Sequence, residues 1–218
     1  MIRGAVFDMD GTITDSNPFW DRAPAAFLEK LGKKAAPELP RIIFSMTLQE
    51  ASEYMINEYS LSLKPEEVTE GLYETMGRFY SEEVELKPGI REILGLIRKM
   101  GIPMAVATVT GRDLVEKALG RHGISELFEC IVTTDDAGAG KHDPAVYLMA
   151  SDKIGSRAEE TLVFEDALHA LKTAGSAGFI TVGVYDEASR DLQREIRAAS
   201  DLYLPDYREL SGLMKILR

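Results

Sequence analysis

The stretch AVFDMDGTITDS, residues 5–16, decides how this chain folds, because it joins a short apolar run to two carboxylates and a glycine. The apolar run at residues 5–7 is long enough for a buried strand, and Asp8 and Asp10 mark its end. In an open α/β sheet, ligands bind outside the carboxyl ends of the strands. Since side chains alternate along an extended chain, Asp8 and Asp10 can point the same way. Carboxylates held this close repel unless a cation or a shared proton offsets their charge. The stretch therefore indicates a metal, with one acid as nucleophile and the other as proton donor and acceptor.

A plainer interpretation of the same residues is a strand followed by an acidic turn. Gly11 would then serve only to give that turn a backbone with positive φ. The two interpretations differ in what they predict further along the chain. Polar residues at the ends of later strands, in a fixed order, favour a catalytic site.

Residues 16–84 carry helical patterns and no strand pattern. Apolar residues recur there at three- and four-residue spacing, which is typical of amphipathic helices. We predict helices at about residues 18–31, 47–59 and 65–80, with a polar loop at 33–40. Thr47 and Glu50 form a capping-box pattern at the start of the second helix. The region is therefore predicted to be a helical subdomain, inserted after the first strand.

From Lys87 onward the sequence alternates between helical patterns and short apolar runs. The apolar runs are residues 103–107, 130–132, 161–164, 179–182 and 202–204. The helical stretches are residues 89–100, 111–122, 143–153, 167–174 and 187–199, with a closing helix from Tyr207. Four glycines fall where helices should stop, namely Gly101, Gly123, Gly155 and Gly178. This alternation predicts βαβ units and a parallel sheet of the α/β class.

Polar residues follow three of these later strands. Thr108 ends the second strand, just before a helix start, where its hydroxyl and the neighbouring backbone N–H groups could bind a phosphate oxygen. Lys141 follows the third strand and could supply positive charge to a phosphoryl group and to neighbouring acids. Glu165 and Asp166 end the fourth strand, where they could complete the oxygen ligands of Mg²⁺.

Each of these residues also has a structural interpretation when taken alone. Thr108 could simply cap the helix that follows it. Lys141 could be an ordinary surface lysine, and Glu165 with Asp166 could be an acidic start for helix 167–174. Their joint occurrence in this order favours the catalytic interpretation.

The set resembles the haloacid dehalogenase-like hydrolases, whose D-x-D-G-T signature matches residues 8–12 and whose later motifs match Thr108, Lys141 and residues 165–166. Asp15-Ser16 extends the resemblance to the branch with a helical cap, which includes the β-phosphoglucomutase and phosphoglycolate phosphatase-like enzymes. The resemblance implies a Rossmann-like parallel sheet core with helices on both faces and a small inserted cap. The core would comprise residues 1–15 and 85–218, and the helical cap residues 16–84.

The resemblance also implies a Mg²⁺-dependent phosphatase that acts on a small phosphorylated metabolite through an aspartyl-phosphate intermediate. Asp8 would attack phosphorus, while Asp10 would protonate the leaving oxygen and then activate water. Phosphate-binding groups would be Thr108, the Val109 N–H and Lys141. The metal would be held by Asp8, the Asp10 carbonyl and Asp166. Glu165 would either bind the metal directly or contact a group that binds it.

Several positions depart from the family pattern and bear on the substrate. Val109 stands where relatives often have Asn or Ser, His142 replaces a proline, and residues 165–170 lack a serine and a glycine. These departures put a typical sugar-phosphate substrate in doubt. The β-phosphoglucomutases carry a cap histidine where this chain has Trp20, and a cap arginine with no counterpart at residues 45–48. A phosphatase is therefore favoured over a mutase, and a non-catalytic binding protein on the same fold is the third alternative.

Composition sets the remaining expectations. The 218-residue chain has 36 acidic and 25 basic residues and a formal net charge of −11, which disfavours binding to nucleic acid. No apolar stretch approaches membrane-spanning length, and no signal peptide is evident. The single cysteine, Cys130, cannot form an internal disulfide, which is typical of the reducing cytoplasm. We expect a cytoplasmic monomer or weak dimer whose partner is a phosphorylated small molecule.

Overall fold

The structure is a computed structural model that describes all residues except 44, 45, 47, 210 and 218. The predicted helix start at Thr47 and part of the segment 45–48 lie outside the described residues. The chain divides into two compact units. One unit comprises Met1–Asp15 and Glu85–Arg218, and the other comprises Ser16–Val84.

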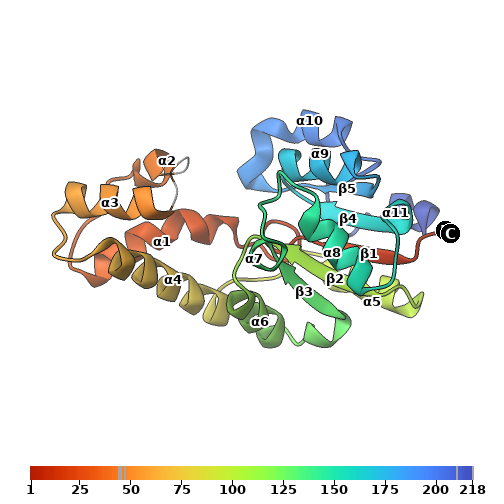
Figure 1. Cartoon of the computed structure of the whole chain (residues 1–218), viewed down its shortest axis with the longest axis horizontal. Helices are drawn as coiled ribbons and strands as arrows, with labels where there is room; N and C mark the ends of the chain where they lie inside the picture. Colours follow the sequence, from red (N-terminus) through yellow and green to blue (C-terminus); the bar gives the residue numbers. More distant parts are fainter. Residues whose placement is uncertain (44–45, 47, 210, 218) are drawn as a thin grey trace. The chain divides into compact units, whose positions relative to one another are not determined.

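The larger unit is built on six parallel strands in the order β3-β2-β1-β4-β5-β6 (Figure 1). The strands are β1 (Gly4–Phe7), β2 (Met104–Thr108), β3 (Cys130–Thr133), β4 (Thr161–Glu165), β5 (Ile180–Val184) and β6 (Leu202–Leu204). All four residues of β1 are buried, as expected for a strand flanked on both sides in a covered sheet. The α/β class and the parallel sheet are confirmed.

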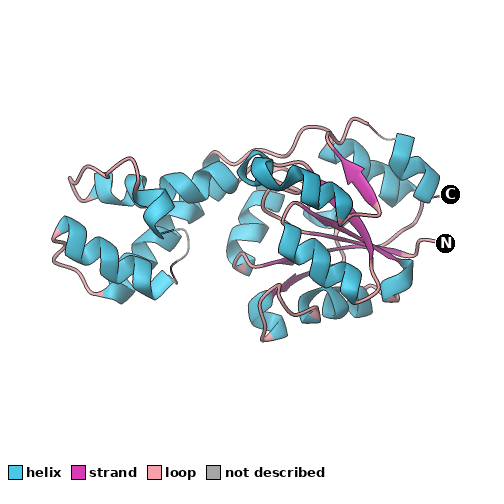
Figure 2. Ribbon diagram, turned by 90° about the horizontal axis from the view of Figure 1, so that it is seen from above, coloured by secondary structure: helices cyan, strands magenta, loops and turns pink. Residues whose placement is uncertain are grey.

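Helices lie on both faces of this sheet (Figure 2). They are α5 (Ile90–Lys99), α6 (Arg112–Arg121), α7 (Thr134–Ala137), α8 (Ala145–Lys153), α9 (Leu168–Ser176), α10 (Gln193–Ala198) and α11 (Ser211–Ile216). Short 3₁₀ turns lie at Ser125–Leu127, Ala158–Glu160 and Glu187–Leu192. Helices α8 and α9 pack on one face through a shared apolar cluster that includes Val6, Val132 and Tyr147.

Helices are the regular elements of the smaller unit in its described residues, and turns and loops connect them. It contains α1 (Asn17–Lys30), α2 (Leu39–Ile43), α3 (Leu48–Tyr59) and α4 (Pro65–Glu82). These helices enclose their own apolar cluster of Phe27, Leu28, Leu39, Met55, Leu61, Val68 and Leu72. The unit thus has a hydrophobic core that does not depend on the sheet.

Three predicted elements need correction. The loop predicted at 33–40 ends early, because α2 begins at Leu39. The helix predicted at 187–199 is a 3₁₀ turn followed by α10, with non-helical backbone at Ser189. Asp186 accepts a hydrogen bond from the Ala188 N–H, and such local bonds compete with a regular helix. The closing helix begins at Ser211 rather than at Tyr207.

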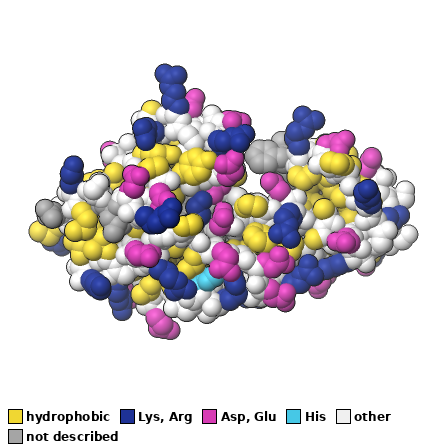
Figure 3. Space-filling view, turned by 180° about the vertical axis from the view of Figure 1, so that it is seen from behind, with side chains coloured by type: hydrophobic (Ala, Val, Ile, Leu, Met, Phe, Trp, Pro, Cys, Tyr) yellow, Lys and Arg dark blue, Asp and Glu magenta, His cyan; other side chains and the backbone are white. Residues whose placement is uncertain are grey.

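The surface agrees with an acidic protein of mixed charge. Figure 3 shows basic side chains scattered among acidic ones on the face that it presents. Among the described residues, no helix combines the length and the apolar character that crossing a membrane requires.

Candidate active site

The candidate site lies at the carboxyl edge of the sheet, where the strand order reverses. Phe7, the last residue of β1, pairs with Val106 of β2 on one side and with Phe164 of β4 on the other. Such a reversal leaves a crevice outside the strand ends, and open α/β sheets bind their ligands there. The residues that follow β1, β2 and β4 are therefore brought to one place.

A tight turn after β1 sets the positions of both aspartates. The Asp8 N–H donates to the Phe164 carbonyl at 3.0 Å, which continues the sheet by one residue. Gly11 has φ of 76°, a conformation that strains other residues. Its N–H donates to the Thr14 carbonyl at 2.8 Å and closes the turn. The turn interpretation of Gly11 is thus correct, and it coexists with the acidic site.

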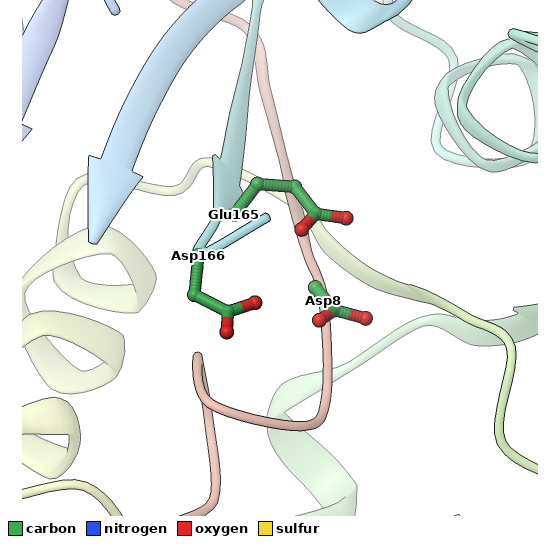
Figure 4. Close-up of side chains that lie close together, drawn as sticks. All are labelled: Asp8, Glu165 and Asp166. Atoms are coloured by element: carbon green, nitrogen blue, oxygen red, sulfur yellow. The ribbon is translucent and has the colours of Figure 1, made fainter. Parts of the chain in front are cut away.

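Three carboxylates converge at this edge. Asp8, Glu165 and Asp166 are buried, and each offers an oxygen within 4.8 Å of the others (Figure 4). Burial, followed by the charge of Glu165, raises the pKa of Asp8 well above its ordinary value. Burial and the same neighbour raise the pKa of Asp166 to about 8. The cluster therefore resists carrying its full negative charge without a cation.

Lys141 supplies part of that positive charge. Its side chain is buried, and its ammonium donates to Asp8 Oδ1 at 2.5 Å and to Glu165 Oε1. Burial by itself would lower the pKa of Lys141, but the charges of Asp8 and Glu165 outweigh it and raise the pKa above its ordinary value. Lys141 is thus a charged group in the centre of the site, and the surface-lysine interpretation is wrong.

The donor set suits a hard divalent cation. Carboxylate oxygens are the ligands that Mg²⁺ prefers, and three of them come from one small volume. Glu165 Oε2 is buried and has no hydrogen-bond partner within the described part of the chain. A buried carboxylate oxygen without a partner lowers the stability of the fold unless a bound ion or water contacts it. The acidic cluster could therefore hold a metal ion.

Thr108 lies at the end of β2 and is fully buried. Its hydroxyl accepts a hydrogen bond from the Thr110 N–H at 3.0 Å, and the N-cap residue of α6 is Gly111. Helix α9 likewise has Ala167 at its N-cap, without a side-chain cap bond. The helix-capping alternatives for Thr108 and for the acidic pair after β4 therefore do not hold. The neighbouring residue Val109 is 62% exposed.

Two residues in contact with the acids were missed by the sequence reasoning. The Tyr147 hydroxyl, from α8, donates to Glu165 Oε1 at 2.7 Å. The Thr110 hydroxyl, just beyond β2, donates to Asp10 Oδ2 at 2.5 Å. Neither has a motif of its own in the sequence. The available signal was position, because Thr110 lies two residues beyond Thr108 and Tyr147 lies on the first turn of the helix after Lys141.

Tyr147→Phe is expected to lower the free energy of unfolding by about 1.5–3 kcal/mol, because it removes a hydrogen bond to a buried charged group. The ring and its packing stay in place. Tyr185→Phe is the matched control, since Tyr185 also donates to a glutamate, at 2.6 Å, but on the surface. Urea unfolding of both variants measures the difference. Equal stability losses in the two variants would contradict a structural role for the buried bond.

The chain is similar to several known proteins. The family profile "Haloacid dehalogenase-like hydrolase" matches residues 5–184. A phosphorylated carbohydrates phosphatase of Thermotoga maritima is 28% identical over 177 residues, covering 81% of this chain and 82% of that protein. A phosphoglycolate phosphatase of Pectobacterium atrosepticum is 28% identical over 190 residues, covering 84% of this chain and 80% of that protein. The crystal structure of a candidate β-phosphoglucomutase of Thermotoga maritima superposes with a TM-score of 0.84 at 25% identity, covering 99% of this chain and 100% of that one.

Proposed function

The chain belongs to the haloacid dehalogenase-like hydrolases, as a phosphatase of phosphomonoesters, and we propose that it hydrolyses a small phosphorylated metabolite with the aid of Mg²⁺. The observation that carries the proposal is the buried cluster of Asp8, Glu165 and Asp166, together with the Lys141 ammonium that donates to the first two of these acids. Phosphoryl transfer needs charge neutralisation and in-line positioning above all. The names of the similar phosphatases support a phosphorylated metabolite as the substrate.

In the proposed reaction, an Asp8 carboxylate oxygen attacks phosphorus, and the bond from phosphorus to the leaving oxygen breaks. Asp10 gives its proton to that oxygen, then takes a proton from water as the water attacks the aspartyl phosphate. The water step releases phosphate and restores the Asp8 carboxylate. Lys141, Thr108 and the Val109 N–H hold the phosphoryl oxygens throughout.

Mg²⁺ would neutralise the negative charge of the phosphoryl oxygens. Asp8, Asp166 and the Asp10 carbonyl would hold the ion, and Glu165 would either bind it directly or contact a group that binds it. Burial of the acids supports this, because their repulsion is relieved when a cation is present.

Hydrolysis of p-nitrophenyl phosphate is expected to stop after exhaustive chelation and to return when Mg²⁺ is added. A second readout does not depend on activity: Mg²⁺ at about 100 times its Kd should stabilise the fold by about 2.7 kcal/mol. Thermal unfolding with and without the ion measures this. Full activity in chelator, with no shift in the unfolding temperature on adding Mg²⁺, would sink the metal proposal.

A mutase remains the alternative, and the smaller unit bears on it. Trp20 occupies the position where β-phosphoglucomutases have a cap histidine, and its indole N–H donates to the Tyr80 hydroxyl at 3.2 Å. An indole cannot exchange a proton at neutral pH, so a phosphatase is favoured. A panel of phosphorylated metabolites decides between them, because a phosphatase releases inorganic phosphate and a mutase returns a rearranged monophosphate.

The expected setting of the enzyme follows from the same sequence. Cys130 is a free thiol, which supports a place in the reducing cytoplasm. The net charge of −11 supports a small-molecule substrate over a nucleic acid. A monomer or weak dimer remains the expected state of the protein.

A further inference from the structure

One hydrogen bond at the site links two segments that are far apart in the sequence. The Thr110 hydroxyl donates to Asp10 Oδ2 at 2.5 Å, across 100 positions of the chain. Thr110 is 2% exposed and Asp10 is 9% exposed, so water has little access to compete for this bond. The distance lies at the short end of the range for O–H···O bonds.

Thr110 itself is held in place from its own segment. Its N–H donates to the Thr108 hydroxyl oxygen at 3.0 Å, and Thr108 is the buried last residue of β2. Helix α6 begins directly afterwards, with Gly111 as its N-cap residue. The strand end and the helix start thus fix the backbone on both sides of Thr110. Its hydroxyl is therefore a rigid reference point for the Asp10 side chain.

A fixed donor matters because of how a carboxylate moves. The terminal torsion of an aspartate is broad and roughly two-fold, so neither oxygen has an intrinsic direction. A bond to Oδ2 sets the plane of the group and makes its two oxygens inequivalent. General acid–base catalysis requires the proton-carrying oxygen to lie within hydrogen-bond reach of the reacting group.

We propose that Thr110 is a positioning residue that orients the Asp10 carboxylate for both proton transfers of the reaction. The proposal rests on the proposed function, in which Asp10 protonates the leaving oxygen in the first step and takes a proton from water in the second. Thr110 exchanges no proton with the substrate. It acts only through the direction in which Asp10 holds its oxygens.

The test replaces the hydroxyl while keeping the shape. Thr110→Val is expected to slow proton-dependent steps about 10- to 100-fold, a part of the 10²–10⁴ that acid–base catalysis contributes. With p-nitrophenyl phosphate, whose leaving group needs no proton, the first p-nitrophenol released should appear at the wild-type rate. Later turnovers should be slow, and phosphorylated Asp8 should accumulate. With β-glycerol phosphate, whose leaving group needs a proton, no such burst is expected.

Thr110→Ser keeps the hydroxyl and should restore wild-type behaviour with both substrates. Thr161→Val is the matched control, because the Thr161 hydroxyl is also buried and bonded, to the Arg157 carbonyl at 2.7 Å, but at the opposite end of β4. Should Thr110→Val fail to fold, Thr110→Ala carries the same comparison against Thr110→Ser. Wild-type turnover in the folded variant, or equal slowing of burst and later turnovers, overturns the proposal.

A double variant distinguishes a failure of the positioning role of Thr110 from a failure of the proposed function. If Thr110 acts through Asp10, adding Thr110→Val to Asp10→Asn should cause no further slowing. Further slowing of about the same factor as in the wild-type background would show that Thr110 acts elsewhere. If Asp10→Asn alone retains wild-type turnover, the proposed function fails. If Asp10→Asn is impaired while Thr110→Val is normal, only the positioning role fails.

Discussion

Asp8→Asn is expected to abolish turnover and to leave no covalent phosphoprotein after any quench. An amide is not a carboxylate nucleophile, so no acyl phosphate can form. In the proposed reaction Asp8 is the nucleophile; it directly follows β1, and its carboxylate accepts a hydrogen bond from the Lys141 ammonium at 2.5 Å. Mass spectrometry of acid-quenched protein, together with phosphate release, measures both losses. Circular dichroism of the same sample establishes that the variant is folded.

Asp10→Asn is the matched comparison, since it changes a neighbouring acid in the same way. Loss of the Asp10 carboxyl group should lower the turnover rate about 10²- to 10⁴-fold, which is the usual contribution of acid–base catalysis. With p-nitrophenyl phosphate the first step should suffer less than the second, so phosphorylated Asp8 should accumulate. Peptide mapping of the phosphoryl group assigns the roles. A label on Asp10, or on any residue other than Asp8, would overturn the mechanism.

The parallel sheet could be predicted because its strands are specified locally. Each strand is a short apolar run, and every strand after β1 follows a helical pattern, as in residues 179–182; buried parallel strands have that apolar composition. Gly178 has φ of 89° just before β5, in agreement with its prediction as a helix stop. Patterns of this kind depend on few tertiary contacts, so the sequence alone reveals them.

The short helices could not be predicted in the same way. Helices α2 and α7 have only five and four residues, too few for an apolar period to be recognised. The broken helix after β5 has the opposite problem, because its residues have a helical composition. Side-chain bonds to the backbone there, such as those of Asp186 and Gln193, favour a 3₁₀ turn. Whether these side-chain bonds or a regular α-helix form depends on the three-dimensional structure, which the sequence pattern does not reveal.

The candidate site could likewise be predicted from the sequence only in part. Asp8, Thr108 and Glu165 stand at strand ends, and parallel strands bring their carboxyl ends to one edge, so their meeting could be predicted from sequence. Tyr147 resembles an ordinary core residue of an amphipathic helix, and Thr110 resembles a residue before a helix start. Their contacts with the acids depend on how α8 and the β2–α6 connection pack. Only the structure reveals those contacts.

Lys141→Ala is expected to lower kcat/KM by about 10²–10³, the usual cost of removing a group that stabilises developing charge. The Lys141 ammonium is buried and donates to both Asp8 and Glu165. In the proposed reaction the same charge binds the phosphoryl oxygens. Its removal leaves two carboxylates beside each other in a buried site, where an uncompensated charge is costly. Both the transition state and the ionised nucleophile should therefore suffer.

Two controls separate this electrostatic role from a general loss of structure. Lys172→Ala removes an exposed lysine from α9 and should change kcat/KM less than about twofold, as surface substitutions usually have small effects. Lys141→Met removes the charge but keeps most of the side-chain volume, so it should be as slow as Lys141→Ala if charge is what matters. Rates are measured at saturating Mg²⁺ and below the unfolding temperature of each variant. A Lys141→Met enzyme that keeps most of its activity would show that the buried ammonium serves packing, and that the phosphoryl group is held by other residues.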